Sequence, residues 1–195
     1  NFLDANSALE LVKEFSEPTA IIVKHNNPCG AASSESLLEA YQMAKATDPV
    51  SAFGGVAAFN KYLDSDTAKE IATTFMEVVI APGFEKGALE VLSKKKDLRL
   101  LEIGTISRGQ SQGMDFRRVV GGLLLQERDL ARIEDIEQLR VVTTRRPTEE
   151  EYQGLAFAWK VAKHVKSNAI VFAKAGQAVG IGAGQMSRVD SVRLA

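Results

Sequence analysis

The chain has 195 residues, of which 45% are hydrophobic and 25% are charged, and its formal net charge is -1. This is the composition of a globular protein and not the strongly basic footprint of a nucleic-acid binder. One cysteine excludes an internal disulfide framework and suits a reducing cytoplasm. No signal peptide and no apolar run of membrane-spanning length occurs, so we expect neither a secreted nor a membrane role.

The first half of the chain alternates between strand-like and helix-like segments. Ser7 and Glu10 fit a capping box for an amphipathic helix over 7–15. Asp64 is placed to cap another helix. Strands are predicted over 19–23, 54–60, 77–82 and 98–103, and helices over 34–47, 65–75 and 85–96. This alternation predicts an α/β layer fold.

The second half is less regular. Segment 104–122 is rich in loop-forming residues, and strands are predicted over 121–129 and 139–147. Thr148 and Glu151 form a second capping box before a long amphipathic helix. That helix is predicted over 149–167, two strands over 168–184 with a turn at 175–177, and a further helix over 185–195. The chain opens without Met and closes without a helix stop signal, so we expect a piece of a longer polypeptide.

The pair Lys24-His25 ends the apolar run that starts at Thr19. Successive strand residues face opposite sides, so both side chains reach one ligand only if the strand ends at Lys24. Asn26-Asn27-Pro28 favours such a break. The pair is then either a solvated lysine with a backbone-bonded histidine, or a pair that moves protons.

Pro28-Cys29-Gly30 matches half of the zinc deaminase pattern H-x-E…P-C-x-x-C. The second cysteine is absent, and neither His25 nor His164 heads H-x-E. A deaminase-type zinc site therefore cannot be assembled, and Cys29 is interpreted as a small packing residue.

Three further stretches each allow two interpretations. The turn from Gly180 to Arg188, GIGAGQMSR, either approaches an anion through its backbone and Arg188, or only needs glycine for a tight turn. Phe53, before Gly54-Gly55, either stacks on a planar ligand or lies where a helix stops and a strand starts. Asn168 either takes part in a site or is an ordinary helix cap.

Taken together, these motifs resemble one family. The stretches that carry the resemblance are VKHNNPCGAA, DPVSAFGGVAAFN, EVVIAPGFEKGALEVLSKKK, KSNAIVFAK and GIGAGQMSRVDSVRLA. In this order they are similar to the transformylase part of the bacterial PurH family. That family joins 5-aminoimidazole-4-carboxamide ribonucleotide (AICAR) transformylase to inosine monophosphate (IMP) cyclohydrolase in purine biosynthesis.

The resemblance implies a cytidine deaminase-like layered α/β lobe without zinc, with a mixed sheet and flanking helices. It implies that residues 1–195 are the first such lobe of the transformylase domain plus a connecting segment. The cyclohydrolase domain and the second lobe are then absent from the chain. A cytoplasmic homodimer is implied, with small-molecule ligands only, and the isolated chain is expected to be inactive. The need for a monovalent cation stays open.

The reaction implied is formyl transfer from the co-substrate 10-formyltetrahydrofolate to the 5-amino group of AICAR. By resemblance, Lys24 and His25 are the catalytic pair. The substrate-binding residues implied are Asn168, Arg188, Gly54 and Glu77, and the folate-side residues are Phe53 and Val189. Glu77 stands where the family pattern has aspartate.

Two alternatives from other classes remain open. One is a noncatalytic nucleotide-binding module, in which Arg188 and the glycine turn bind phosphate and Lys24-His25 is structural. The other is a structural piece that mediates dimerisation.

Overall fold

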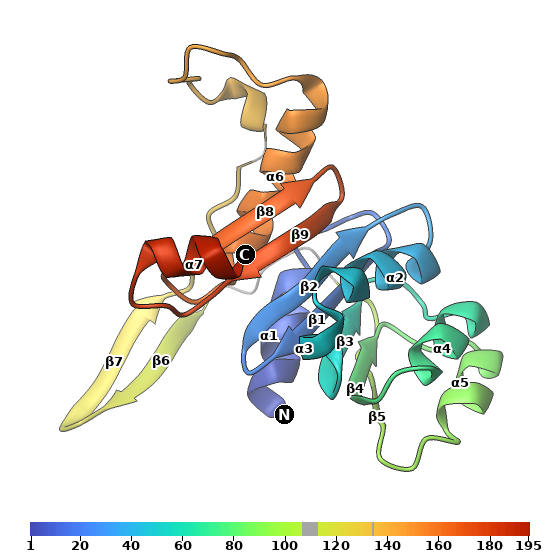
Figure 1. The fold of residues 1–195 in the computed structure, drawn as a ribbon. Helices are drawn as coiled ribbons and strands as arrows, with labels where there is room; N and C mark the ends of the chain where they lie inside the picture. Colours follow the sequence, from blue (N-terminus) through green and yellow to red (C-terminus); the bar gives the residue numbers. More distant parts are fainter. Residues whose placement is uncertain (107–112, 134) are drawn as a thin grey trace.

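A computed structural model describes residues 1–106, 113–133 and 135–195 (Figure 1). Seven strands form one mixed sheet in the order β5-β4-β3-β1-β2-β9-β8. The pairs β3–β4 and β4–β5 are parallel, and the other neighbours are antiparallel. The strands are β1 Thr19–Lys24, β2 Asn27–Ser33, β3 Gly55–Phe59, β4 Met76–Ala81, β5 Arg99–Glu102, β8 Ile170–Lys174 and β9 Gln177–Gly182. The mixed α/β sheet with flanking helices is thereby confirmed.

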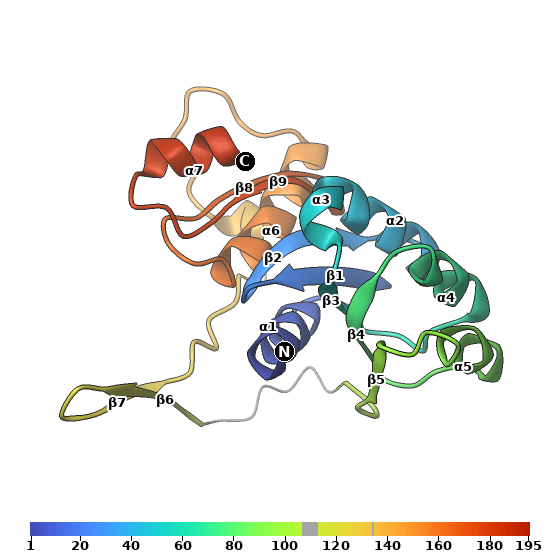
Figure 2. The same cartoon turned by 60° about the horizontal axis from the view of Figure 1, so that its bottom comes forward.

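Helices cover both faces of this sheet, as Figure 2 shows. Helices α1 and α6 contribute to one core cluster, and α2, α4 and α5 contribute to the other. The helices are α1 Phe2–Val12, α2 Leu37–Thr47, α3 Pro49–Ala52, α4 Ser65–Ala72, α5 Lys86–Leu92, α6 Glu149–Lys163 and α7 Arg188–Leu194, with a short 3₁₀ turn at Ile136–Gln138. None of the helices in the described ranges combines the length and apolar character needed to cross a membrane.

Strand β1 lies in the middle of the sheet and is buried on both faces. Ala20 and Ile22 belong to the cluster under α2, whereas Ile21 and Val23 belong to the cluster under α1 and α6. Alternate residues of a strand face opposite sides, so a strand between two helix layers must be apolar at every position. This burial explains why the sequence over 19–23 is a continuous apolar run.

Two expectations for the first half are wrong. Helix α1 begins at Phe2, not at Ser7, because Asp4 favours the first turn and Ala5 already packs against the core. Residues 27–33 are strand β2, although Pro28 suggested a loop. The proline is tolerated because it lies where the β1–β2 register shifts, between Ile22 and Val23.

The second half also differs in two places. Residues 114–119 and 122–127 form strands β6 Met114–Val119 and β7 Gly122–Glu127, so part of the segment expected to be irregular is a hairpin. Residues 107–112 of that segment lie outside the described residues. No strand occurs over 139–147, where Val142 is exposed and unpaired with any sheet in the described part of the chain. The capping box at Thr148, the β8–β9 pair and α7 are confirmed.

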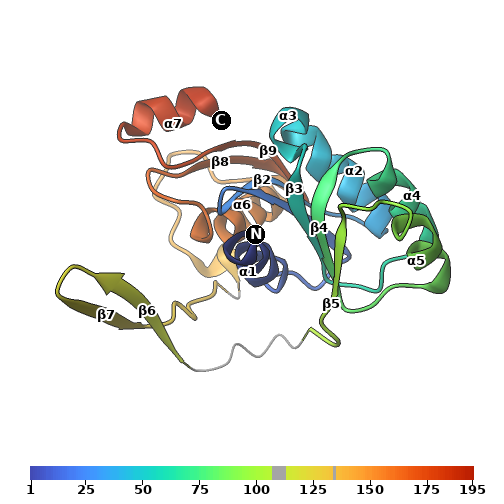
Figure 3. The same cartoon turned by 90° about the horizontal axis from the view of Figure 1, so that it is seen from below.

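The β6–β7 hairpin projects from the body of the molecule, as Figure 3 shows from below. Arg128 pairs with Glu10, which fixes the base of the hairpin to α1. The Arg128 amide donates to the Gly113 carbonyl at 3.3 Å and closes the hairpin. All residues of both strands are exposed, including Phe116 and Leu123. An isolated two-stranded hairpin is at best marginally stable in water. This hairpin therefore has apolar surface that a partner could cover.

The buried carboxylate of Glu14, which follows α1 in the chain, connects α1 to α6. The Glu14 side chain is 4% exposed and accepts from Lys163 Nζ at 3.1 Å. His164 Nε2 lies 3.3 Å from the same oxygen, and Arg132 lies 3.4 Å from the other. Burial raises the pKa of Glu14, but the hydrogen bonds and charges of His164 and Lys163 outweigh it and lower the pKa to about 2.

Replacement of Glu14 by glutamine is expected to make stability less dependent on pH in the acid range. A carboxyl whose pKa is depressed on folding stabilises the protein above its unfolded pKa, and this contribution disappears as the pH falls through the folded pKa. The difference in melting temperature between wild type and Glu14→Gln should thus be largest near pH 6 and shrink between about pH 4 and pH 2. Thermal melts at stepped pH measure it. A difference that stays constant over this range would contradict the prediction.

Candidate functional site

The turn that carries His25 has an unusual backbone. Lys24 is the last residue of β1 and pairs with Asn27, the first residue of β2. The two residues between them, His25 and Asn26, have φ angles of 51° and 62°. Two central residues with positive φ are the mark of a type I′ hairpin turn, and histidine is an uncommon occupant. The Asn26 amide donates to Asp4 Oδ1 at 2.8 Å, which ties the turn to α1.

The strand ends at Lys24 as expected, but a two-residue hairpin turn follows it in place of the expected loop. His25 is exposed and Lys24 half-buried. Because the strand ends at Lys24, the alternation that would separate the two side chains no longer applies beyond it. Whether the two side chains open on one shared cleft stays a prediction.

Lys24 is held in place by the backbone next to β3. Its Nζ donates to the Gly54 carbonyl at 2.7 Å and to the Phe53 carbonyl at 3.1 Å. An ammonium has three N–H donors, so one stays available for a ligand. Gly54 has a φ of +66°, and a Cβ there would lie 3.0 Å from Lys24 Nζ. Glycine at this position therefore satisfies both the backbone conformation and the close approach of the ammonium.

Of the residues expected near β3 and β4, Phe53 lies beside Lys24. Phe53 is 61% exposed, and its ring lies against Phe75 with 5.4 Å between centroids. Glu77 is in β4, and its carboxylate accepts a hydrogen bond from the Asn1 side chain. An exposed ring beside a fixed ammonium is a surface on which a planar ligand could stack.

Asn168 braces the glycine-rich turn. Its Nδ2 donates to the carbonyls of Gln185 and Met186 at 2.9 and 3.0 Å, and its carbonyl accepts from Ser191 Oγ at 2.8 Å. The side-chain nitrogen of Asn168 is thus engaged in hydrogen bonds within the fold. Its side-chain oxygen is the atom available to contact a ligand. This brace holds Asn168 close to the start of α7, where Arg188 and Val189 are exposed.

Packing explains two of the glycines in that turn. A Cβ at Gly180 would lie 1.9 Å from the Ala195 carbonyl oxygen, and one at Gly182 would lie 1.9 Å from that of Ser191. Both glycines let α7 rest directly on β9. Only Gly184, with a φ of +67° and open space around it, is a turn glycine by conformation. Packing and turn geometry therefore account for these three glycines, and anion binding through Arg188 stays a prediction.

All the candidate residues lie at the same end of the seven-stranded sheet. β1 ends there at Lys24, and β3, antiparallel to β1, begins there. β4, parallel to β3, also begins there, and β9 ends there because it pairs antiparallel to β2. The residues gathered by these strand ends are Lys24, His25, Phe53, Gly54, Glu77, Asn168, Arg188 and Val189.

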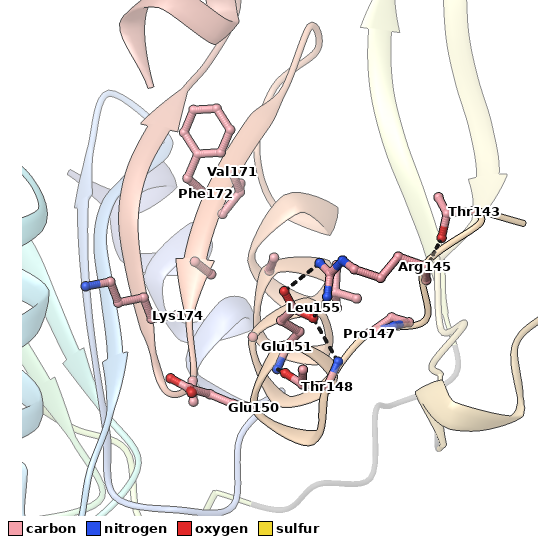
Figure 4. A pocket seen from close by; sticks show the side chains of 14 residues that line it. Thr143, Arg145, Pro147, Thr148, Glu150, Glu151, Leu155, Val171, Phe172 and Lys174 are labelled. Carbon is pink, nitrogen blue, oxygen red and sulfur yellow. Dashed lines mark hydrogen bonds and ion pairs between the residues drawn. The ribbon is translucent and has the colours of Figure 1, made fainter. Parts of the chain in front are cut away.

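Two large cavities lie elsewhere in the described structure. A cavity of about 660 Å³ lies between α6 and the edge strand β8, where Arg145 pairs with Glu151 at 2.8 Å (Figure 4). A second, of about 610 Å³, lies near Phe15, Ser33 and Phe157 at the opposite end of β1 and β2. Neither contains a residue of the candidate site. A binding site needs convergent polar groups as well as space, and the candidate residues supply such groups at the shared sheet end.

Cys29 is not a reactive group. Its Sγ donates to the Ile22 carbonyl at 3.5 Å, and it packs against the core under α2. Burial, with a smaller effect of Asp48, raises the pKa of the thiol to about 12. The thiolate that reactivity requires is therefore disfavoured. In the described ranges no three His, Cys, Asp or Glu side chains are grouped to hold a metal ion.

Two residues that contact the turn were not singled out from the sequence. Asp4 accepts from Asn26, and Asn27 Oδ1 accepts from the Lys166 amide at 2.9 Å. Asn27 Nδ2 also donates to the His25 carbonyl at 3.3 Å. The tendency of asparagine to bond nearby backbone, in a segment with two of them, was the available indication for Asn27. No local sequence pattern predicted the contact of Asp4 with the turn.

Comparison with known proteins gives a family match over the whole chain. Residues 1–195 match the model described as AICARFT/IMPCHase bienzyme. The bifunctional purine biosynthesis protein PurH of Magnetococcus marinus is 57% identical over 197 positions, and that of Sorangium cellulosum is 51% identical over 195. Each alignment takes in 100% of this chain but 37% of the relative, so the chain spans little more than a third of their length.

Solved structures give weaker matches. A dCMP deaminase from the cyanophage S-TIM5 has 15% identity and a TM-score of 0.40, covering 51% of this chain and 97% of the deaminase. RibD of Acinetobacter baumannii has 12% identity and a TM-score of 0.38, covering 52% of this chain and 35% of RibD.

Proposed function

Because the chain belongs to the AICARFT/IMPCHase bienzyme family, we propose that it is part of an enzyme of purine biosynthesis that transfers a formyl group from 10-formyltetrahydrofolate to the 5-amino group of AICAR. The observation that carries this proposal is the Lys24-His25 turn, held at the sheet end where Asn168 and Arg188 also lie. A cytoplasmic site fits the single cysteine.

In this reaction the amine nitrogen attacks the formyl carbon, and a new C–N bond forms. The amine is conjugated with a carboxamide and is a weak nucleophile, so His25 takes its proton as the bond forms. The bond from the formyl carbon to the folate nitrogen then breaks, and that nitrogen receives a proton. The products are formyl-AICAR and tetrahydrofolate.

Lys24 suits the charge that develops during the transfer. Two of its three N–H groups are used by the Phe53 and Gly54 carbonyls. The third is available to stabilise the oxyanion of the tetrahedral intermediate, or to protonate the departing folate nitrogen. An ammonium that is already oriented by backbone carbonyls loses little freedom when it meets that charge.

The other residues at this end of the sheet have proposed roles in binding. Asn168 holds the formyl region through its side-chain oxygen, and Arg188 contacts the nucleotide phosphate. Gly54 and Glu77 lie beside the aminoimidazole, and Phe53 and Val189 form the folate-side wall. Zinc has no part in the proposed chemistry.

We assign residues 1–195 to the first lobe of the transformylase domain and its connecting segment. Under this proposal the cyclohydrolase domain and the second lobe belong to the rest of the protein. The enzyme acts as a homodimer whose second copy helps to close the site. The apolar β6–β7 hairpin supports self-association, since Phe116, Leu123 and Leu125 form one face together with Met114.

The intact protein is expected to release tetrahydrofolate from 10-formyltetrahydrofolate when AICAR is present, and the 195-residue chain alone is not. Transfer requires both reactants to be fixed within attack distance, and lost positioning can remove most of the rate even when acid–base groups remain. Absorbance at the tetrahydrofolate band follows both reactions. A turnover of the isolated chain close to that of the intact protein would contradict the assignment to one incomplete lobe.

The hairpin also supports the alternative that this part of the protein is a dimerisation module. Sedimentation of the chain with and without AICAR separates the two. Self-association that AICAR does not alter, combined with an intact protein that transfers no formyl group, would favour the module.

A further inference from the structure

We propose that Asn27 is a positioning residue that sets the distance between the Lys24-His25 turn and the Asn168–Arg188 segment. This inference rests on the proposed function, because it concerns how the two halves of the proposed site are kept in register. Asn27 itself is not expected to touch the substrates.

In the part of the chain that the structure describes, β2 and β9 pair at one end only. Their ladder joins Ala32 to Gln177, and the Ser33 amide donates to the Gly176 carbonyl at 2.8 Å. Both contacts lie at the end of β2 that is remote from the Lys24-His25 turn. In the described ranges no ladder pair continues from there towards Asn27. The two halves of the sheet are therefore fastened at the far end and not by backbone pairing at the site.

The Asn27 side chain bridges that gap. Its Oδ1 accepts from the Lys166 amide at 2.9 Å, and its Nδ2 donates to the His25 carbonyl at 3.3 Å. One amide group thus contacts both the turn that carries His25 and the segment that leads to Asn168.

The bridge continues to the second half of the site. The Gly184 amide donates to the Lys166 carbonyl at 2.8 Å, and the Asn168 amide donates to the Gln185 carbonyl at 3.1 Å. The Asn168 side-chain amide in turn donates to the Met186 carbonyl at 3.0 Å. A continuous series of hydrogen bonds therefore runs from the His25 carbonyl through Asn27 to the loop before Arg188.

The chemistry explains why an amide is needed. The bridge requires one acceptor for Lys166 and one donor for His25, and asparagine supplies both from one short side chain. Aspartate keeps the acceptor but has no donor when ionised, and alanine has neither. Asparagine therefore makes both contacts, aspartate keeps only the contact to Lys166, and alanine makes neither.

Loss of the Asn27 bridge is expected to lower turnover more than it lowers the affinity for AICAR. The nucleotide is held mainly by the Arg188 half, whereas proton transfer comes from the His25 half. If the two halves drift apart, AICAR still binds but is displaced from Lys24 and His25. Displacement by about 1 Å can cost about 100-fold in rate.

The test uses the intact protein with Asn27→Ala, Asn27→Asp and the control Asn26→Gly. Asn26 is the adjacent amide in the same turn, its Oδ1 has no hydrogen-bond partner in the described structure, and glycine accepts its positive φ. For Asn27→Ala we expect kcat for formyl transfer to fall about 10- to 100-fold, with KM for AICAR within about threefold and an unchanged melting temperature. Asn27→Asp should retain more of kcat than Asn27→Ala, and Asn26→Gly should behave as wild type.

Three outcomes would overturn the inference. The first is an Asn27→Ala variant with kcat within twofold of wild type. The second is a loss of kcat matched by an equal loss of AICAR affinity or by unfolding, with Asn27→Asp no better. The third is an equal effect of Asn26→Gly. Lys24→Ala separates these from a failure of the proposed function: if that variant keeps its activity, the catalytic assignment itself is wrong.

Discussion

Replacement of Lys24 by alanine is expected to lower formyl transfer by the intact protein about 10²- to 10⁴-fold while AICAR binding stays within about threefold of wild type. The ammonium is fixed by the Phe53 and Gly54 carbonyls, so its third N–H is aimed and does not depend on a mobile side chain. Alanine removes the ammonium that neutralises the oxyanion in the proposed mechanism. Transfer of a labelled formyl group and equilibrium binding of AICAR measure the two effects separately.

A second variant tests the other member of the pair. His25→Asn removes the imidazole, but asparagine tolerates the left-handed backbone that His25 adopts, with its φ of 51°. We expect a comparable loss of transfer with the turn intact. Lys69→Ala is the matched control, because that side chain is 65% exposed on α4 and pairs only with Asp66 in the described structure.

The result also decides between the proposed enzyme and the noncatalytic alternative. Loss of transfer with AICAR binding retained supports catalysis by Lys24 and His25. A nucleotide-binding module in which the pair is structural predicts the reverse, with folding or binding impaired. Full transfer activity in both variants would show that the proton-transfer groups lie elsewhere.

Replacement of Gly30 by alanine is expected to destabilise the protein by about 3 kcal/mol or more. Gly30 lies in β2 directly under α2, and a Cβ there would be 2.1 Å from the Ala44 carbonyl oxygen and 2.8 Å from its carbon. The obstacle is backbone within a helix, so no side-chain rotation relieves it. Because β2 begins at the Lys24-His25 turn, any displacement of β2 also moves the proposed site.

Gly122 supplies the control for this prediction. A Cβ at Gly122 meets nothing within 4 Å, and its φ is not positive. Gly122→Ala should therefore change stability by no more than about 0.5 kcal/mol. Thermal melting of the intact protein measures both variants. Equal melting temperatures for Gly30→Ala and Gly122→Ala would mean that α2 can move away from β2 at little cost.

The sequence by itself determined the parts that local chemistry specifies. The apolar run over 19–23 predicted a buried strand, because a strand between two helix layers has no polar face. Thr148 and Glu151 predicted the start of α6, because the capping box is complete within four residues. Motif order along the chain was sufficient for the family, which the match over residues 1–195 shows.

Where the local pattern was ambiguous, the pairing partner decided. Pro28 indicated a loop, but the shifted register opposite Ile22 and Val23 admits it into β2. Residues 139–147 have the composition of a strand, yet they have no strand to pair with in the described structure. A strand is stabilised by its neighbours, so its existence depends on residues far away in the sequence.

Only the tertiary structure decided how the candidate residues are brought together. The sequence could place Lys24 and His25 at the end of one strand. Gly54, Glu77 and Asn168 join them because β3, β4 and β9 also begin or end at that edge of the sheet. The bridge from Asn27 to Lys166 joins residues that are 139 positions apart in the sequence. Such contacts follow from the packing of whole elements, whose arrangement no local pattern encodes.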